Sequence, residues 1–518
     1  MSDLFDDYGT ATVRTRAYDE MFDADQSVRA AYRQVEDVLG GLTLGDVSAR
    51  ADSMARTFLD RGVTFDYAGE ERPFPLDIVP RVIPAAEWDV LERGVAQRVQ
   101  TLEAFLDDVY DSMAVVADGV VPRSLITSSS HFHRCVAGFR PVGGVRVHVS
   151  GVDVVRDGTG CFRVLEDNVR VPSGVSYVIE NRRAMAKGLP EAFTQQDIRG
   201  VDDYPRHLLH ALRRTAPPSV ADPTVVVLTP GVFNSAYFEH TLLAGLMGVE
   251  LVEGRDLVCR ANRVYMRTTA GEQRVDVIYR RVDDDFIDPL QFRSDSLLGC
   301  PGLVNAARAG NVTIANAIGN GVADDKLIYS YLPDLIRYYR GEDPIIPNVD
   351  TFRLEEDAAR EEVLDRLEEL VVKPVDGSGG KGIVIGPDAT REELDALRQR
   401  VIADPRGWIA QPVLQLSTVP TMAGDRFGPR HVDLRPFAVN DGDEVWVLPG
   451  GLTRVALQEG SLIVNSSQGG GSKDTWVVGD GPAPAMPAGA APRPGRERVS
   501  VWPIESNARD RQGEAQQQ

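Results

Sequence analysis

The chain lacks any long apolar run. No stretch of its 518 residues reaches the roughly 18 consecutive apolar residues that a membrane-spanning helix needs. Its first ten residues, MSDLFDDYGT, are acidic and have neither the basic start nor the apolar stretch of a secretory signal. We therefore expect a cytoplasmic protein with no membrane partner.

Cysteine is scarce, and basic residues are outnumbered by acidic ones. The four cysteines are far apart in the sequence and form no C-x-x-C pair, which favours reduced thiols over a disulfide framework. Lysine and arginine number 56 against 77 acidic residues, and the net charge of −21 opposes binding to a phosphate backbone. We expect no nucleic-acid partner, in a globular protein of about two to four domains.

Periodicity predicts a mainly helical N-terminal region over residues 1–125. Apolar residues recur at intervals of three and four over 27–42, 47–62 and 85–110, as they do on one face of a helix. The segment PFPLDIVPRVIP, residues 73–84, interrupts this pattern and is expected to be an extended, proline-punctuated connector.

A central α/β region is predicted over 126–345. The segments 145–157 and 160–171 alternate like neighbouring strands around a tight turn, and residues 224–254 follow a strand-helix-strand order typical of a parallel layer.

Two further regions follow. Residues 346–478 combine helices, strands and a glycine-rich loop, and 479–518 are rich in Ala, Pro, Gly and Gln and are expected to be disordered. The fold class expected for the whole chain is α+β or α/β.

The glycine-rich loop lies between two short apolar runs, LVVKPV and GIVIG, that each predict a strand. A Rossmann site requires a helix after the loop, and a Walker A site requires a closing Gly-Lys-Ser/Thr, so neither fits. Loop backbone N–H groups and lysines suit an anion. We therefore predict a hairpin flap over nucleotide phosphates, with Lys373 directed toward them; a plain surface hairpin is the alternative. The flap residues are Gly377, Ser378, Gly379, Gly380, Lys381 and Gly382.

A second signal is Glu166 and Asn168, at the end of a predicted strand. Residues two apart on a strand share a face, so a carboxylate and an amide oxygen would lie side by side, as suits Mg²⁺. Asp153, on the preceding strand, could face the same site as a third ligand. Ordinary turn chemistry is the alternative.

These features resemble the circularly permuted ATP-grasp proteins, a group related to glutathionylspermidine synthetase. In most of the ATP-grasp superfamily the flap precedes the Glu-x-Asn pair, and here the order is reversed. The similarity extends over most of residues 15–478 and is that of an actinobacterial-type member. It rests on VLEDNVRVPSGVSYVIENR, LTPGVFNSAYFEH, ADDKLIYSYLP, VVKPVDGSGGKG, HVDLRPF and VNSSQGGGSKDTW.

The resemblance implies roles for individual residues. Lys326 and Lys373 would hold the phosphates of ATP, and Arg435 would stabilise the transferred phosphoryl group. From the residues alone, Lys326 could instead be solvated, and Arg435 could form an ion pair with Asp433 or Asp441. The implied adenine-contacting residues are Gln411, Val413 and Leu414.

The implied activity is an ATP- and Mg²⁺-dependent ligase that activates a small-molecule or peptide carboxylate as an acyl phosphate and joins it to an amine or a thiol. Two alternatives stay open, a kinase of a small molecule and a nucleotide-binding partner subunit without catalysis.

Other motifs are given simpler interpretations. His131 and His133 are expected in a loop with ordinary hydrogen bonds, and Asp283–Asp285 in a solvated acidic loop. Ser173 is expected to cap a helix or, together with Arg170, to shape the acceptor pocket. Gly469–Lys473 could hold phosphate or the acyl substrate, or be a flexible loop.

Overall fold

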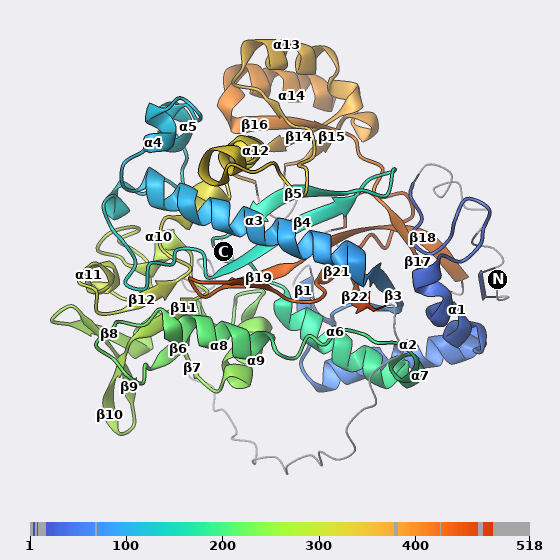
Figure 1. Cartoon of the computed structure of the whole chain (residues 1–518), viewed down its shortest axis with the longest axis horizontal. Coiled ribbons are helices and arrows are strands. Elements are labelled where there is room, and N and C mark those ends of the chain that lie inside the picture. The colour runs from blue at the N-terminus through green and yellow to red at the C-terminus, as the bar shows by residue number, and fades with distance from the viewer. Residues whose placement is uncertain are drawn as a thin grey trace.

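A large central sheet organises the molecule. The computed structural model describes residues 4–5, 8, 17–67, 70–377, 382–424, 426–464 and 470–479. The long helix α3 (Ala85–Val109) runs across this sheet, and a smaller sheet with two helices lies above it in Figure 1. The mixed α/β class is confirmed. Apart from Gly479, the tail predicted over 479–518 lies outside the described residues.

The central sheet joins segments from distant parts of the chain. Its strands follow the order β20-β19-β4-β18-β21-β22-β3, with β5 paired to β4 and β17 paired to β18. All eight residues of β4 are buried, as expected of a strand covered on both faces. The strands are β3 (Leu76–Pro84), β4 (Val149–Arg156), β5 (Phe162–Asn168), β17 (Thr418–Ala423), β18 (Arg426–Arg435), β19 (Phe437–Asn440), β20 (Val445–Val447), β21 (Leu452–Val455) and β22 (Gly471–Val478).

The connector expected over residues 73–84 is wrong in part, because most of it forms β3. This strand lies at the sheet edge, where proline costs no ladder hydrogen bond, and it pairs in parallel with β22. The register shifts between the pairs Lys473↔Asp77 and Thr475↔Arg81. Pro80 lies within that irregularity, so the strand accommodates it without breaking.

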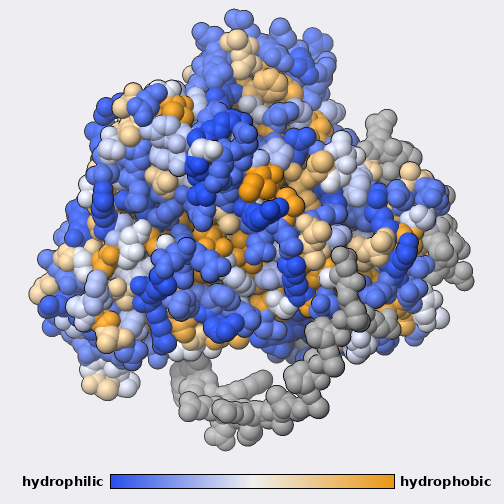
Figure 2. Space-filling model, viewed as in Figure 1, coloured by the Kyte–Doolittle hydropathy of each residue, from blue (hydrophilic) through white to orange (hydrophobic). Residues whose placement is uncertain are grey.

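The helices predicted in the N-terminal region are confirmed as α1 (Arg33–Gly40), α2 (Leu44–Asp60) and α3. Among the described helices, none combines the length and the apolar character needed to cross a bilayer. On the face shown in Figure 2, apolar side chains form small groups among polar ones.

The parallel layer predicted over 224–254 is also confirmed. Strands β6 and β7 flank helix α9 and pair in parallel, and the four-stranded sheet has the order β12-β11-β6-β7. A three-stranded sheet of β8, β9 and β10 adjoins this unit in Figure 1. The elements are β6 (Val225–Leu228), α9 (Tyr237–Met247), β7 (Glu250–Val252), β8 (Leu257–Arg260), β9 (Arg263–Thr268), β10 (Gly271–Val275), β11 (Val277–Arg280) and β12 (Thr313–Ala315).

The smaller sheet has the order β13-β16-β14-β15 and its own apolar core with α13 and α14. Its elements are β13 (Phe352–Arg353), α13 (Asp357–Asp365), β14 (Leu370–Pro374), β15 (Val384–Ile385), α14 (Arg391–Ala403) and β16 (Trp408–Pro412). The central sheet contains strands from three of the four regions predicted from the sequence. These regions therefore do not fold as separate sheets, and the boundaries between them stay a prediction. The remaining elements are β1 (Thr64–Tyr67), β2 (Glu70–Pro73), α4 (Ala114–Ala117), α5 (Arg123–Thr127), α6 (Val175–Gly188), α7 (Pro190–Gln195), α8 (Tyr204–Arg214), α10 (Asp284–Ile287), α11 (Leu303–Arg308) and α12 (Lys326–Arg340).

The contact between α3 and β5 yields a stability prediction. Arg98 donates to both carboxylate oxygens of Asp167 at 2.9 and 2.6 Å, and the two side chains are 1% and 0% exposed. Arg98→Ala should lower the free energy of unfolding by about 3–5 kcal/mol, because it leaves a buried carboxylate without its partner. Arg140→Ala is the matched control: its pair with Asp111 is 75% and 52% exposed, so its loss should cost less than about 1 kcal/mol. Equal effects in chemical denaturation would contradict the prediction.

Candidate active site

A cavity of about 500 Å³ is lined by residues of the central sheet and of the smaller sheet. It brings together the side chains that the sequence singled out on segments far apart in the chain. The predicted residues that line it are Asp153, Glu166, Asn168, Lys326, Lys373, Gly377, Gln411, Leu414 and Arg435. Val413 is not among its lining residues.

The hairpin of β4 and β5 supplies the acidic side of the cavity. Asp153 pairs with Glu166 across the ladder, and Asn168 follows two residues later on the same face. The intervening Asp167 binds Arg98 of α3 instead. The alternation expected from the sequence therefore places Glu166 and Asn168 side by side at the cavity.

Asp153 is held by two arginines. Arg435 donates to its two carboxylate oxygens at 2.5 and 2.8 Å, and Arg454 donates to one of them at 2.8 Å. Burial would raise the pKa of Asp153, but Arg435 and Arg454 outweigh it and hold that pKa well below its usual range. The ion pair considered for Arg435 with Asp433 or Asp441 is not the one formed, because Asp433 binds Arg454.

Arg454, which sequence reasoning missed, was identifiable only from the pairing of β21 with β18. On β18, Asp433 and Arg435 lie two residues apart and so share a face, but the sequence does not show which strand lies beside them.

Two lysines from different elements reach the same cavity. Lys326 is the first residue of α12, and its Nζ donates to the carbonyl of Gly377 at 2.5 Å and lies 3.5 Å from Glu166. Lys373 on β14 donates to Oε1 of Gln411 at 2.7 Å. Burial lowers the pKa of Lys373 to about 8. A half-buried ammonium close to a second lysine favours an anionic ligand.

The two strands predicted on either side of the glycine-rich loop are confirmed as β14 and β15, which pair antiparallel, and the role of the loop as a phosphate flap stays a prediction. Gly377 and Gly382 border the turn, and Gly382 has a φ of +75°, a conformation that favours glycine. The flap residues Ser378, Gly379, Gly380 and Lys381 lie outside the described residues. At the predicted adenine strand, Gln411 also donates through Nε2 to Thr351 at 2.9 Å, so its side chain links Lys373 of β14 to the residue just before β13.

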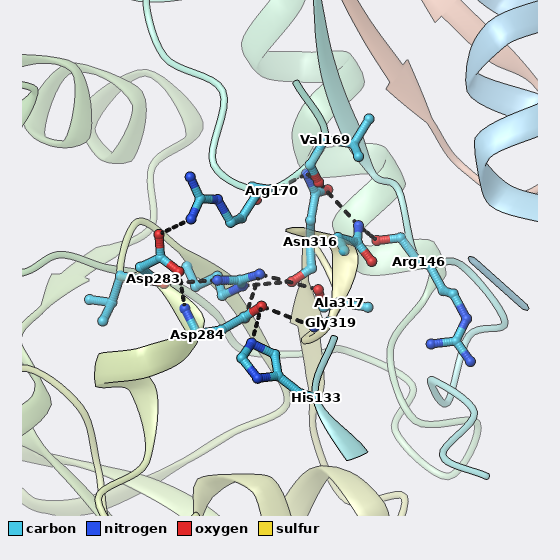
Figure 3. A network of polar contacts seen from close by, with 12 residues as sticks. His133, Arg146, Val169, Arg170, Asp283, Asp284, Asn316, Ala317 and Gly319 are labelled. Carbon is cyan, nitrogen blue, oxygen red and sulfur yellow. Dashed lines mark hydrogen bonds and ion pairs between the residues drawn. The ribbon is translucent and has the colours of Figure 1, made fainter. Parts of the chain in front are cut away.

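A polar network borders the cavity on the side of Arg170. Figure 3 shows Arg170 turned toward Asp283, at 2.8 Å, with Asp284 between the His133 ring and the backbone of Gly319. The solvated loop expected over Asp283–Asp285 is therefore wrong for Asp284, which is 1% exposed and also pairs with Arg280. The run of three aspartates predicted an exposed loop. Asp284 is buried instead because Arg280, the last residue of β11, compensates its charge.

Two more expectations need correction. Gly174, and not Ser173, precedes α6; its φ is +115°, and its N–H donates to Glu239 of α9 at 2.7 Å. In the segment Gly469–Lys473, Lys473 lies on β22, is fully buried and pairs with Asp77 of β3 at 2.5 Å. Its charge is therefore used in an ion pair between two strands of the central sheet. Gly469 itself lies outside the described residues.

The fold and the lysine-lined cavity fit the ATP-grasp class of proteins. The chain belongs to the circularly permuted ATP-grasp type 2 family, whose model matches residues 80–456. This confirms the family expected from the sequence motifs and the order of those motifs along the chain.

Several known proteins are similar to this chain. A Mycobacterium tuberculosis protein is 62% identical over 475 residues, covering 92% of this chain and 86% of the relative. The "Putative glutamate--cysteine ligase 2-2" of Frankia casuarinae is 47% identical over 466 residues, covering 89% of this chain and 53% of the relative. The chain thus spans about half of that Frankia protein.

A solved structure supports the fold alone. The glutathione synthetase-like effector from Globodera pallida matches with a TM-score of 0.55 at 11% identity, covering 84% of this chain and 98% of the effector.

Lys373 provides a test of the cavity as a phosphate site. Lys373→Met keeps the apolar stem but removes a charge, and a charged contact contributes about 1.5–3 kcal/mol, so the Kd for ATP should rise roughly ten- to a hundredfold. Because the free lysine loses its proton as the pH rises through about 8, wild-type affinity should fall across that pH and the variant should lack this step.

Isothermal titration with ATP and Mg²⁺ measures both effects. Lys187→Met, at an exposed position on α6 away from the cavity, is the control and should leave the Kd unchanged. An unchanged Kd for Lys373→Met would mean that Lys373 does not contact the nucleotide.

Proposed function

We propose that the protein is an ATP- and Mg²⁺-dependent ligase that joins a carboxylate to an amine or a thiol through an acyl phosphate. The observation that carries this proposal is the meeting of Lys326, Lys373, Glu166 and Arg435 from four separate elements at one cavity. Membership of the ATP-grasp family supports the use of ATP.

The lysines would bind the ATP phosphates. Lys326 already contacts Gly377 at the edge of the flap, so the flap and the lysine can act on the same phosphate group. Lys373 approaches from β14, on the strand that leads into the flap. Compact ammonium groups on long side chains can follow the phosphate as it moves. Together they would neutralise charge and orient the γ-phosphate toward the carboxylate.

Glu166 and Asn168 fit a magnesium site. The nearest cations to Glu166, on Lys326 and Arg435, are 3.5 and 4.0 Å away, so its oxygens are not committed to short hydrogen bonds with them. Nδ2 of Asn168 is buried and has no hydrogen-bond partner; as a donor it could contact a phosphate oxygen, whereas Oδ1 is the atom that would bind the metal. When bound, Mg²⁺ would offset phosphate charge during transfer.

Asp153 is less available to a metal than Glu166, since both its oxygens accept from arginines. Among the described residues, no group of three or more His, Cys, Asp and Glu side chains is arranged to hold a metal. We propose that the protein supplies few metal ligands and that the phosphates supply others, which is the usual coordination for Mg²⁺. In that arrangement Asp153 either binds Mg²⁺ as a third protein ligand or acts only by positioning Arg435.

Arg435 would stabilise the phosphoryl group in transit. Its guanidinium lies in the cavity wall, 4.0 Å from Glu166 and fixed by Asp153. Nε and Nη2 are held by Asp153, so the remaining Nη1–Nη2 edge, with Nη1 3.3 Å from the carbonyl oxygen of Ser173, is the one that could donate to phosphoryl oxygens, and a positioned donor needs little reorganisation during the reaction.

The name of one relative suggests which substrates to test first. The name of the Frankia protein points to glutamate as the acid and to cysteine as the nucleophile, so these are the first pair to test. An ADP-release screen should compare acids alone, nucleophiles alone and pairs. Turnover that requires both supports the ligase. Turnover with an acid or alcohol alone would instead indicate a kinase, and ATP binding without turnover would indicate a non-catalytic partner subunit.

Loss of Arg435 should separate catalysis from binding. Arg435→Ala should lower kcat by about 10²–10³ while the Kd for ATP changes much less, because the contact strengthens during phosphoryl transfer. Arg435→Lys should recover little of the rate, since it keeps the charge but loses the fork. The ion pair with Asp153 requires a stability control, so the denaturation curve of each variant must be measured. A large drop in stability with an unchanged kcat in the folded fraction would show a purely structural role.

A further inference from the structure

A thiol pair lies outside the cavity and has no role in the proposed ligase. Cys259 is on β8 and Cys300 lies shortly before α11, 41 residues later in the chain. Their Sγ atoms are 3.6 Å apart. The sequence showed four scattered cysteines without a paired motif, so only the fold brings these two together.

The two thiols are chemically unequal. Cys259 is half-buried, whereas Cys300 is 1% exposed. The hydrogen bond from Cys300 lowers the pKa of the Cys259 thiol. The thiolate is the form that peroxide oxidises, and the more accessible sulfur reacts first. Cys259 therefore has the features of the attacking thiol and Cys300 those of the resolving thiol.

The backbone around the pair is closely packed. A Cβ on Gly299 would lie 2.1 Å from the carbonyl oxygen of Ile287, and Cys300 donates its N–H to that same oxygen at 3.0 Å. A Cβ on Gly302 would lie 3.3 Å from Cβ of Cys259. The chain segments are thus already in close contact, and bond formation needs the sulfurs to approach by side-chain rotation, since a disulfide joins sulfurs about 2.05 Å apart.

We propose that Cys259 and Cys300 form a peroxide-oxidisable pair that closes to an intramolecular disulfide. The Cys259 thiolate attacks one peroxide oxygen, the O–O bond breaks, and a sulfenic acid and hydroxide result; the hydroxide takes up the proton that the Cys259 thiol released and leaves as water. The sulfur of Cys300, on losing its proton, attacks the sulfur of Cys259, the S–O bond breaks, and a second water leaves. Two thiols are oxidised to one disulfide, and one hydrogen peroxide is reduced to two waters.

This bond would connect two parts of the fold. Strand β8 belongs to the three-stranded sheet, whereas Cys300 is hydrogen-bonded to Ile287, the last residue of α10. Asp283, directly before α10, lines the cavity and pairs with Arg170. Oxidation would therefore restrain the element that carries a residue of the cavity wall.

Peptide mass spectrometry, after oxidation of the full-length folded protein, tests the proposal independently of any ligase activity. The folded wild-type chain is treated with a small molar excess of hydrogen peroxide, alkylated and digested with trypsin. Cleavage after Arg255 and Arg260 isolates Cys259, and cleavage after Arg293 and Arg308 isolates Cys300. The expected product is a cross-link between these two peptides, with the loss of two hydrogen atoms and complete reversal by dithiothreitol.

Two cysteine variants distinguish the proposed disulfide from other products of oxidation. Cys161→Ser removes an exposed cysteine and should leave the cross-link intact, whereas Cys300→Ser should abolish it and allow Cys259 to proceed to sulfinic acid. The proposal is overturned if the wild-type Cys259 is over-oxidised without cross-linking, if it pairs with Cys135 or Cys161, or if Cys259 and Cys300 remain alkylatable at peroxide levels that oxidise Cys161.

Discussion

One buried carboxylate, Asp153, sets the arrangement of the cavity because two arginines share it. Asp153 lies on β4, with Arg435 on the neighbouring β18 and Arg454 on β21 beyond it. A buried charge is tolerated only when it is paired and hydrogen-bonded, so these three side chains must be positioned together. The pairing keeps the Arg435 guanidinium in the cavity wall, next to Glu166, instead of leaving a flexible side chain to reach solvent.

The same charge network extends from the cavity to the N-terminal segment. Arg81 on β3 donates to the backbone carbonyl of Asp433 at 2.9 Å and pairs with Glu20 at 2.6 Å. Burial would raise the pKa of Glu20, but Arg81 and Arg156 lower it to about 2. Arg81 therefore connects the N-terminal segment to Asp433, a residue of the cavity wall. Each motif is a local hairpin, and the two hairpins belong to different sheets whose side chains meet at the cavity.

Much of the fold could be predicted from the sequence where the signal is local. The hairpins around Glu166 and around Gly377 were predicted correctly, since alternating residues and a glycine-containing turn lie next to each other in the chain. The prediction failed for β3, whose prolines indicated a connector, because only its parallel pairing with β22 makes it a strand. It failed for Asp284 because Arg280, on the preceding strand, and the N–H of Gly319 stabilise a carboxylate that composition alone places at the surface.

The sequence by itself determined the family, most of the secondary structure and the set of charged residues suited to phosphate and magnesium. Tertiary structure alone decided the partners of those residues: Asp153 for Arg435, Gln411 for Lys373, Gly377 for Lys326 and Cys300 for Cys259. The physical reason is that periodicity and turn chemistry act over a few neighbouring residues, whereas these contacts depend on which strands, helices and loops the fold brings together. That arrangement is set by the burial of apolar faces and the pairing of buried charges across the whole chain.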